Sequence, residues 1–395
     1  MGFRCKCFGV AAFWAVTLSL SAEVPAPQTW PMFRGSPGLL GVSQVRFPVT
    51  SLGLLWSFKT QGPVKSSAAI DQRRVYAGSS DGHLYALDLQ TGKKLWAFKT
   101  EGAIESSPLV LNDRVFVGST DANLYALEAA TGKLLWKYQT GDKIPGAPNF
   151  FRRQDGAVSI IVGSYDYNLH CVDAATGKSN WVYESSNYIN GSPAVFQGQT
   201  IFGGCDALLH VISLADGKQT QELQGGAYIA GSVAVRHQLA FFGHMENEFQ
   251  CFDLRKGTNL WTYKDRLFPY YSSPAVTEDR VIFGGRDKRL HCLNLKDGKP
   301  VWTFLTRGKV DSSPVVCGDK VFVGSEDGRL YMVALNTGKE LWSYELGQPI
   351  TSSPAVVENK VVIGCDDGAV YAFAPLMAAS KREGGSAGTP RPTRK

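Results

Sequence analysis

The sequence contains no apolar stretch long enough to cross a membrane as a helix. An apolar run from Phe8 to Leu20 is shorter than the roughly 20 residues that a spanning helix needs. No window combines a helical hydrophobic period with capping residues, which argues against an α-helical domain. Gly-x-Ser-x-Gly, His-Glu-x-x-His and phosphate-loop motifs are also missing. These absences disfavour helical membrane proteins and several large enzyme classes.

Charge is scarce over most of the chain. The formal net charge is +6, but Arg4, Lys6 and the basic residues after Met377 supply all of it. The residues between them are neutral overall, so the chain lacks the basic surface typical of a nucleic-acid partner. The Gly/Pro/Ser-rich segment 376–395 is predicted to be a disordered basic tail.

The first residues have the pattern of a secretory signal. A basic start precedes the apolar run, and small residues follow it at Ser19–Ala22. We therefore predict a signal peptide over residues 1–22 and a periplasmic or secreted protein. Cys5 and Cys7 precede the apolar run, so neither occupies the position of the lipid-bearing cysteine of a bacterial lipoprotein.

Glycine is abundant and recurs at a fixed period. The recurring positions are 40 or 41 residues apart, with one gap of 45: Gly78, Gly118, Gly163, Gly203, Gly243, Gly284, Gly324 and Gly364. Eighteen positions after each of the first seven stand Trp96, Trp136, Trp181, Gln221, Trp261, Trp302 and Trp342. Two residue types in register over most of the chain identify a repeat protein.

One repeat contains four short apolar runs separated by turn signals. In residues 105–139 the turns fall at Asn112-Asp113, Thr120-Asp121 and Thr131-Gly132. Each unit is therefore predicted to be an antiparallel meander of strands A to D, and such sheets pack radially as propeller blades. The glycine of the Thr-Gly-Lys turn suits a positive φ. The tryptophan is expected to fill the seam between adjacent blades.

The two ends of the repeat region complement each other. The last repeat has Arg382 where strand D should carry tryptophan, whereas Trp56 in residues 54–59 has no preceding A, B or C strand. We therefore predict an all-β, eight-bladed propeller over residues 54–375, closed by the N-terminal strand completing the C-terminal blade. This closure leaves no open edge. Residues 23–53 are predicted to be a leader segment that packs on the propeller.

The repeat motifs Ser-Ser-Pro, Gly-Ser-x-Asp-Gly-x-Leu-Tyr-Ala-Leu-Asp and Thr-Gly-Lys-x-x-Trp resemble those of the pyrroloquinoline quinone (PQQ)-like β-propeller family. The resemblance covers roughly residues 30–375, and WPMFRG at 30–35 resembles a leader found before such repeats. The family includes quinoprotein alcohol dehydrogenases and the outer-membrane assembly factor BamB. Its motif residues hold blades together, so the resemblance implies the fold and leaves the function open.

The resemblance does not extend to the catalytic features of the dehydrogenases. Those members carry an adjacent Cys-Cys pair, calcium ligands and a tryptophan inside the funnel. This chain has no Cys-Cys pair, and apart from Trp14 and Trp30 its tryptophans stand in strand D. We therefore predict no catalytic residue and no cofactor, with PQQ binding kept as an alternative.

No metal site is predicted either. His170, His210 and His291 occupy the strand C position that Tyr85 holds in another repeat, so packing explains them. Cys171, Cys251, Cys292, Cys205 and Cys365 likewise follow the repeat spacing, which argues against a disulfide framework or a zinc site.

Function is expected where the repeat is irregular, because loops vary freely on a rigid scaffold. Repeat three has five extra residues in its A–B loop, around residues 150–156. Aromatic residues gather in the D–A and B–C connections of one sector, which emerge on the same face of a propeller. The predicted partner-binding residues are Tyr165, Tyr167, Tyr188, Tyr228, His244, Phe268, Tyr270 and Tyr271. The predicted blade-docking residues are Trp56, Trp96, Trp136, Trp181, Trp261, Trp302 and Trp342.

These features favour a non-catalytic binding or scaffold propeller of the bacterial envelope, similar in kind to BamB. A protein partner or envelope component is expected, with no nucleic acid and no transmembrane span, on a monomeric chain. One alternative is a PQQ-binding or oxidoreductase-associated protein. The second alternative is a propeller that binds a glycan or a peptide.

Deleting residues 23–60 tests the closure. The deletion is expected to expose a blade edge and to remove Trp56 from its seam. Loss of a buried tryptophan alone costs about 3–5 kcal/mol, so the melting temperature should fall and the variant should associate. Thermal melts and size-exclusion chromatography measure both effects. A monomeric variant with an unchanged melting temperature would contradict the closure.

Overall fold

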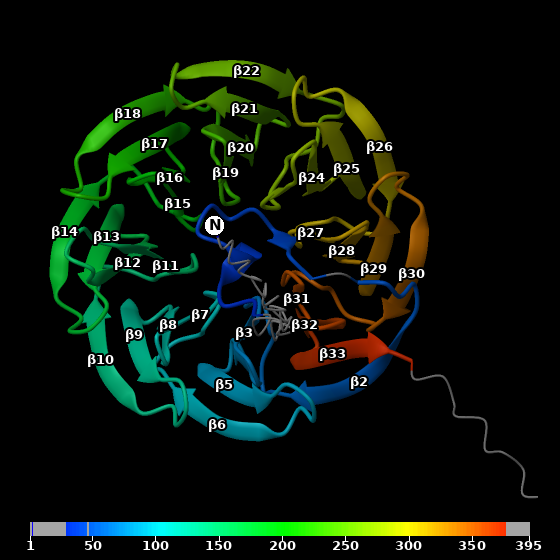
Figure 1. Ribbon diagram of the computed structural model, residues 1–395, viewed down its shortest axis with the longest axis horizontal. Coiled ribbons are helices and arrows are strands. Elements are labelled where there is room, and N and C mark those ends of the chain that lie inside the picture. Colours follow the sequence, from blue (N-terminus) through cyan, green and yellow to red (C-terminus); the bar gives the residue numbers. More distant parts are fainter. Residues whose placement is uncertain (1, 3–28, 46, 377–395) are drawn as a thin grey trace, which may run out of the picture.

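The computed structural model describes residue 2, residues 29–45 and residues 47–376, and this part of the chain forms a ring of eight sheets (Figure 1). Apart from Gly2 and Leu376, the predicted signal peptide and basic tail lie outside the described residues. No helix of the described part combines the length and the apolar character that crossing a membrane requires.

Each blade is numbered by its place in the chain, and its strands run outward from the central channel. Blade 1 consists of β3 (Ala69–Ile70), β4 (Arg74–Gly78), β5 (His83–Asp88) and β6 (Lys94–Lys99), and blade 2 of β7 (Leu109–Leu111), β8 (Arg114–Gly118), β9 (Asn123–Glu128) and β10 (Leu134–Gln139). Blade 3 consists of β11 (Asn149–Arg152), β12 (Val158–Gly163), β13 (Asn168–Asp173) and β14 (Ser179–Glu184), and blade 4 of β15 (Ala194–Phe196), β16 (Gln199–Gly203), β17 (Leu208–Ser213) and β18 (Gln219–Gln224). Blade 5 consists of β19 (Ala234–Arg236), β20 (Leu239–Gly243), β21 (Phe249–Asp253) and β22 (Thr258–Tyr263), and blade 6 of β23 (Ala275–Val276), β24 (Arg280–Gly285), β25 (Arg289–Asn294) and β26 (Pro300–Leu305). Blade 7 consists of β27 (Val315–Cys317), β28 (Lys320–Gly324), β29 (Arg329–Ala334) and β30 (Glu340–Glu345). Blade 8 consists of β31 (Ala355–Val357), β32 (Lys360–Cys365), β33 (Ala369–Pro375) and β2 (Leu52–Lys59).

The predicted closure is confirmed. Strand β2 pairs antiparallel with β33, and Trp56 lies opposite Ala372. In Figure 1, β2 is the outermost strand beside β33, so the two ends of the repeat region share blade 8. One strand was not expected: β1 (Val42–Ser43) pairs in parallel with β27 and adds a fifth, innermost strand to blade 7.

Burial follows the radial position of each strand. The second and third strands are buried on both faces because neighbouring blades cover them, as in β5 and β9. The outermost strands alternate between exposed and half-buried residues, as in β6 and β10. The core is therefore a series of inter-blade layers arranged around the channel.

Six tryptophans of the outermost strands each join one blade to the next. The indole N–H of Trp96 donates a hydrogen bond to the carbonyl of Ala129, in the C–D turn of blade 2, at 3.1 Å. Gly132 of that turn has a φ of +74°, and a Cβ there would lie 2.6 Å from the Trp96 ring. Glycine is therefore required for its conformation and for its space. The same hydrogen bond, at 2.7–3.2 Å, is made by Trp56, Trp136, Trp181, Trp261 and Trp302.

The seam between blades 4 and 5 lacks this contact. Gln221 replaces the tryptophan, and its side-chain oxygen is buried without a hydrogen-bond partner. A Cβ at Gly257 would meet nothing closer than Leu223, at 3.3 Å. The turn glycine is present, but no ring packs on it.

The leader closes one end of the channel. Between Trp30 and Ser43 it forms hydrogen bonds of 2.7–3.4 Å with the first strand of every blade, close to the A–B turns. The blade residues in ring order are Ile70, Val110, Asn149, Val195, Val235, Val276, Val316 and Val356. Figure 1 shows this segment in dark blue at the centre of the ring.

A buried arginine lies at the centre of this contact. Arg34, in the short 3-10 helix η1 (Phe33–Gly35), is 1% exposed. Its guanidinium donates to the carbonyls of Pro274, Ser313 and Pro314 at 2.6–3.1 Å. Burial lowers the pKa of Arg34 to about 9. Three carbonyls from blades 6 and 7 thus stabilise a charge that is removed from water.

Substitutions at two equivalent positions test the tryptophan seam. Gln221→Trp is expected to be neutral or stabilising, because the turn glycine Gly257 is retained and the buried, unpartnered side-chain oxygen of Gln221 is removed. Trp136→Gln should destabilise the protein by more than about 2 kcal/mol, through loss of a large side chain and its hydrogen bond. Denaturant melts measure both. Small and equal effects at the two positions would contradict the role of the indole.

A pair of glycine substitutions tests the buried arginine. Gly41 and Gly198 have φ values of +63° and +78°, so alanine is strained at both. A Cβ at Gly41 would lie 1.9 Å from the Arg34 guanidinium, whereas nothing lies within 4 Å of one at Gly198. Gly41→Ala should therefore cost about 1.5–3 kcal/mol more than Gly198→Ala, the range for a hydrogen bond to a charged group. Equal urea midpoints would show that displacing Arg34 is harmless.

Candidate functional site

The D–A loops and B–C turns form the face opposite the leader, and the channel opens at its centre. One residue from each blade surrounds the opening: Lys65, Glu105, Pro145, Asn190, Ala230, Tyr271, Asp311 and Thr351. The hollow has a volume of about 190 Å³, and Phe33 of the leader contributes to its lining. Because the leader occupies the other end, the hollow is accessible from this face.

A belt of serine hydroxyls lines the channel just inside the opening. The backbone N–H of Ser353 donates to the hydroxyl of Ser67 at 2.8 Å, and this pattern recurs from blade to blade. The accepting hydroxyls, at 2.8–3.0 Å, belong to Ser67, Ser107, Ser192, Ser232, Ser273, Ser313 and Ser353. Ala147 interrupts the belt. The Ser-Ser-Pro motifs therefore join inner strands, as the sequence indicated, and their hydroxyls are already hydrogen-bonded.

The charges at the opening are paired. Lys65 forms an ion pair with Glu105 at 3.0 Å, and the hydrogen bond to Glu105 raises the pKa of Lys65. Arg286 pairs with Asp311 at 2.8 Å, which raises the pKa of Arg286. The same guanidinium lies 3.6 Å from the ring centre of Tyr271. The opening therefore carries no field of a single sign.

Three of the predicted binding residues form one cluster over blades 3 and 4. The rings of Tyr165 and Tyr188 stack with centroids 4.6 Å apart, and Tyr167 meets Tyr188 edge-on at 5.0 Å. Tyr167 and Tyr188 are 40% and 38% exposed. Tyr167 also has a φ of +73°, at the B–C turn position that Gly82 occupies in blade 1. Ala122, Ala207, Asn247 and Lys288 adopt the same left-handed conformation at this position with φ of +65° to +67°, so the backbone of Tyr167 follows the repeat and its side chain alone distinguishes it.

A second group lies over blades 5 and 6. Tyr228 is 51% exposed, and Phe268 is 47% exposed beside the exposed Leu267. The Tyr271 hydroxyl donates to the Met245 sulfur at 3.5 Å. These two groups define what we call the aromatic sector: Tyr165, Tyr167, Tyr188, Tyr228, Met245, Leu267, Phe268 and Tyr271.

Two predicted binding residues are not exposed, so that expectation is wrong for them. Tyr270 is 1% exposed and packs edge-on against Phe283, with centroids 5.0 Å apart. His244 is also 1% exposed, and its ring lies 3.3 Å from the amide nitrogen of Gln250. Tyr270 points inward because its loop has an extra residue, which places it where Ile104 and its counterparts contact the recurring glycines.

The histidines of strand C have inter-blade partners that the spacing did not reveal. His170 hydrogen-bonds Asp166 at 3.0 Å through Nε2 and the Tyr138 hydroxyl of the preceding blade at 3.0 Å through Nδ1. Burial alone would raise the pKa of Asp166, but hydrogen bonds from His170 and the Gly141 amide outweigh it and hold the pKa at about 2. The other two Tyr–His–Asp relays are Tyr183–His210–Asp206 and Tyr263–His291–Asp287. The predicted packing role of these three histidines is thus confirmed in part. They also make hydrogen bonds, to an aspartate of their own blade and a tyrosine of the preceding one.

The residues of the channel do not fit a bound quinone. Serine, glycine and alanine dominate the lining, and neither tryptophan nor cysteine belongs to it. Among the described cysteines, burial raises the pKa of Cys251 and Cys292 to about 12. Their thiols therefore stay protonated at neutral pH and unreactive.

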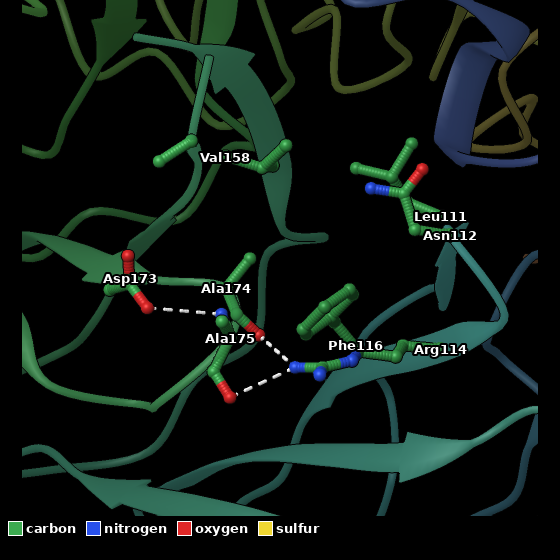
Figure 2. Close-up of a pocket in the computed structure, with 9 residues that line it drawn as sticks. Leu111, Asn112, Arg114, Phe116, Val158, Asp173, Ala174 and Ala175 are labelled. Atoms are coloured by element: carbon green, nitrogen blue, oxygen red, sulfur yellow. Dashed lines mark hydrogen bonds between the residues drawn. The ribbon is translucent and has the colours of Figure 1, made fainter. Parts of the chain in front are cut away.

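Hollows on the leader face lie over the seams between blades. Figure 2 shows the one between blades 2 and 3, of about 250 Å³, where Arg114 donates to the carbonyls of Ala174 and Ala175 at 2.6 and 3.0 Å. Its guanidinium thus already holds the neighbouring blade. A second hollow, of about 410 Å³, lies beside the enlarged A–B loop of blade 3, next to Phe151 and Arg153. Arg153 pairs there with Asp173 at 3.2 Å.

The ring of eight blades, the serine belt and the tryptophan seams define a PQQ-like β-propeller. A family model described as "Outer membrane protein assembly factor BamB" matches residues 50–263 and 246–380. The matches cover most of the chain, which therefore belongs to the BamB family of PQQ-like propellers. A comparison with curated proteins returns no match.

Solved structures with the same fold come from both branches of the family. BamB from Moraxella catarrhalis is 18% identical with a TM-score of 0.69, covering 83% of this chain and 99% of its own. The quinohemoprotein alcohol dehydrogenase from Comamonas testosteroni is 16% identical with a TM-score of 0.74, covering 93% and 82%. A europium-containing methanol dehydrogenase is 16% identical with a TM-score of 0.72, covering 89% and 99%. Such identities establish the fold alone.

Proposed function

We propose that this protein is a non-catalytic scaffold of the bacterial envelope that binds a protein partner through the aromatic sector. The observation that carries the proposal is the concentration of exposed aromatic and apolar side chains on one sector of one face. Tyrosine and phenylalanine are enriched at interfaces because they bring a large contact area at a small entropic cost. Tyr167 adds to this argument, since it places a 40% exposed ring at a turn position where the other blades have Gly, Ala, Asn or Lys.

The channel supports a scaffold better than a catalyst. Its serines are engaged in the belt, and its charged residues are paired. The leader fills the far end, so a substrate would have to react in a shallow, polar hollow of about 190 Å³. This geometry therefore favours a non-catalytic role over a catalytic one.

Location in the envelope is part of the proposal. It rests on the signal-peptide pattern of residues 1–22 and on membership of the BamB family. The absence of a cysteine directly after the apolar run favours a periplasmic or secreted chain over a lipid-anchored one. The paired surface charges of the opening fit a monomer that meets its partner through apolar contacts.

A pair of double variants tests the binding face. Tyr167→Ala/Tyr188→Ala removes two exposed rings, whereas Leu95→Ala/Leu135→Ala removes two exposed leucines from outer strands of blades 1 and 2. Both variants should melt within a few degrees of the wild type. A photo-crosslinking residue placed at position 268 should capture a partner from envelope fractions. The amount of captured partner should fall at least tenfold in the tyrosine double variant. It should be unchanged in the leucine control.

Other outcomes identify the alternatives. Equal capture by both variants would place the site elsewhere, with the enlarged loop of blade 3 as the next surface to test. Recovery of an oligosaccharide or a short peptide in place of a protein would favour the glycan- or peptide-binding alternative. Dye-linked alcohol oxidation after addition of PQQ and calcium would contradict the non-catalytic assignment.

A further inference from the structure

The aspartate of the B–C turn normally receives two sets of hydrogen bonds. Its Oδ1 accepts from its own turn, and its Oδ2 accepts from the loop that leads into the blade. In blade 3, the Gly141 amide donates to Asp166 Oδ2 at 2.7 Å. The equivalent pairs, at 2.8–3.0 Å, are Gln61 with Asp81, Glu101 with Asp121, Ser186 with Asp206 and Arg307 with Asp327. Each of these carboxylates is therefore satisfied on both oxygens.

Blade 6 departs from this pattern. Its leading loop has one extra residue, and Asp265 stands where Thr60 and Thr100 follow the outer strands of other blades. Asp287 of the B–C turn has a side chain 1% exposed, and its Oδ2 has no hydrogen-bond donor. The Nε2 of His291 lies 3.2 Å from both oxygens of Asp287, but its single hydrogen bond is made to Oδ1. A buried carboxylate lone pair is thus left free, which is costly without a cation or a proton.

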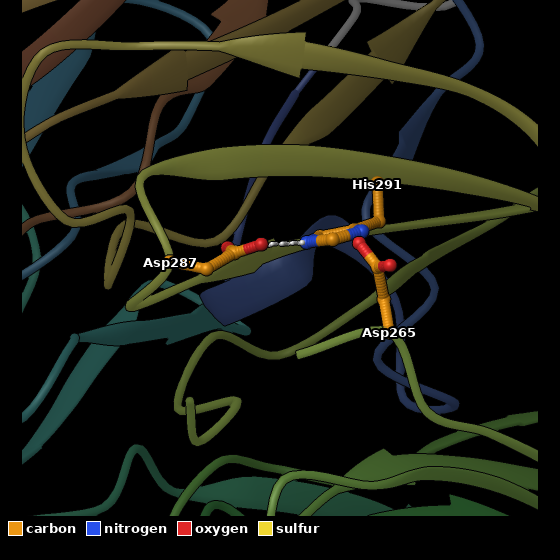
Figure 3. A group of neighbouring side chains, drawn as sticks. All are labelled: Asp265, Asp287 and His291. Carbon is orange, nitrogen blue, oxygen red and sulfur yellow. Dashed lines mark hydrogen bonds and ion pairs between the residues drawn. The ribbon is translucent and has the colours of Figure 1, made fainter. Parts of the chain in front are cut away.

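A second carboxylate approaches the same point. Asp265, Asp287 and His291 each offer one ligand atom, and the three atoms lie within 4.8 Å of one another. Figure 3 shows the carboxylates of Asp265 and Asp287 on either side of the His291 ring. The neighbouring cations are too far to satisfy them by hydrogen bonds: Arg266 lies 3.6 Å from Asp265, and Arg289 lies 3.9 Å from Asp287. Each acid therefore has an arginine at ion-pair distance, but Oδ2 of the buried Asp287 receives no hydrogen bond from it.

The surrounding residues orient this group as ligands. The Tyr263 hydroxyl lies 3.2 Å from His291 Nδ1, so in the metal-bound form Nδ1–H would donate to this oxygen and the unprotonated Nε2, directed at Asp287, would bind the ion. Metal-bound histidines commonly have their other nitrogen fixed in this way. Two ligands about 2.1 Å from one ion in tetrahedral to octahedral geometry lie about 3.0–3.4 Å apart, which agrees with the 3.2 Å between Nε2 and the Asp287 carboxylate. Asp265 is exposed, so its side chain can move to complete the set.

We propose that Asp265, Asp287 and His291 bind one divalent transition-metal ion, with Zn²⁺ as the best match, at the junction of blades 5 and 6. One imidazole and two carboxylates suit zinc, and imidazole disfavours Ca²⁺ and Mg²⁺. Water completes the coordination on the exposed side. The ion ties the loop after β22 to the B–C turn of blade 6, and this loop carries Leu267 and Phe268 of the aromatic sector. The site does not depend on the proposed function.

The other Tyr–His–Asp relays provide internal controls. Blade 3 has the same tyrosine, histidine and aspartate, but the Gly141 amide satisfies Asp166, and no second carboxylate joins the cluster. Asp142 is an exposed acid in the leading loop of that blade. Asp142→Ala is therefore a matched control for Asp265→Ala, and both substitutions leave the buried residues of their relays in place.

The test uses untagged full-length protein treated with a chelator and then dialysed. Calorimetric titration of the wild type with Zn²⁺ should show one site per chain, and Zn²⁺ should raise the melting temperature, since a ligand that binds the folded state stabilises it. Asp265→Ala should weaken binding at least tenfold and abolish the rise, while Asp142→Ala should keep both. Co²⁺ should give a visible absorption band in the wild type that His291→Gln loses.

The outcomes are decisive in both directions. Without metal, Asp265→Ala should melt within a few degrees of the wild type, because its side chain is exposed. Absence of Zn²⁺ binding by the wild type would overturn the site and indicate that a proton satisfies Asp287. Equal binding by wild type and Asp265→Ala would assign the metal to other residues. Capture of a partner through Tyr188 tests the proposed function separately, and its result does not depend on whether the metal site exists.

Discussion

The structure depends on contact between the outer strand of one blade and the C–D turn of the next. A four-stranded sheet buries neither face alone, so each blade is stable only where its neighbours cover it. The indole over the turn glycine, with its hydrogen bond to a carbonyl, makes that contact specific in position. Because the seams form a closed ring, β2 must return to β33, and the two ends of the repeat region become neighbours.

The leader adds a second closed set of contacts inside the first. By bonding to the first strand of every blade, it links blades that do not touch one another. Arg34 supplies the centre of this arrangement, held by carbonyls because no carboxylate of the described residues pairs with it. The channel is thereby closed at one end. A fold shared with quinone-dependent dehydrogenases here encloses a small polar hollow.

The departures from the repeat concentrate in blades 3 to 6. The rigid ring tolerates them because loops on its faces carry few of the inter-blade contacts. Tyr167 places an exposed aromatic ring at a turn position where the other blades have smaller or charged side chains. The extra residue before Tyr271 turns Tyr270 inward, and Asp265, at the position that follows each outer strand, lies close to Asp287. The same sector thus combines an exposed aromatic surface with a cluster of Asp265, Asp287 and His291 in which one buried carboxylate oxygen has no hydrogen-bond donor.

The sequence by itself determined the fold, because the contacts that hold blades together are repeated residues at fixed spacing: the tryptophan, the turn glycine and the serines. It also located the sector where the repeat is irregular, and it placed Tyr167 and Tyr188 on the exposed face. Only the tertiary structure decided which side chains of that sector face inward, as Tyr270 and His244 do. It alone revealed the path of the leader and the meeting of Asp265 with His291, since both depend on contacts between residues that no period relates.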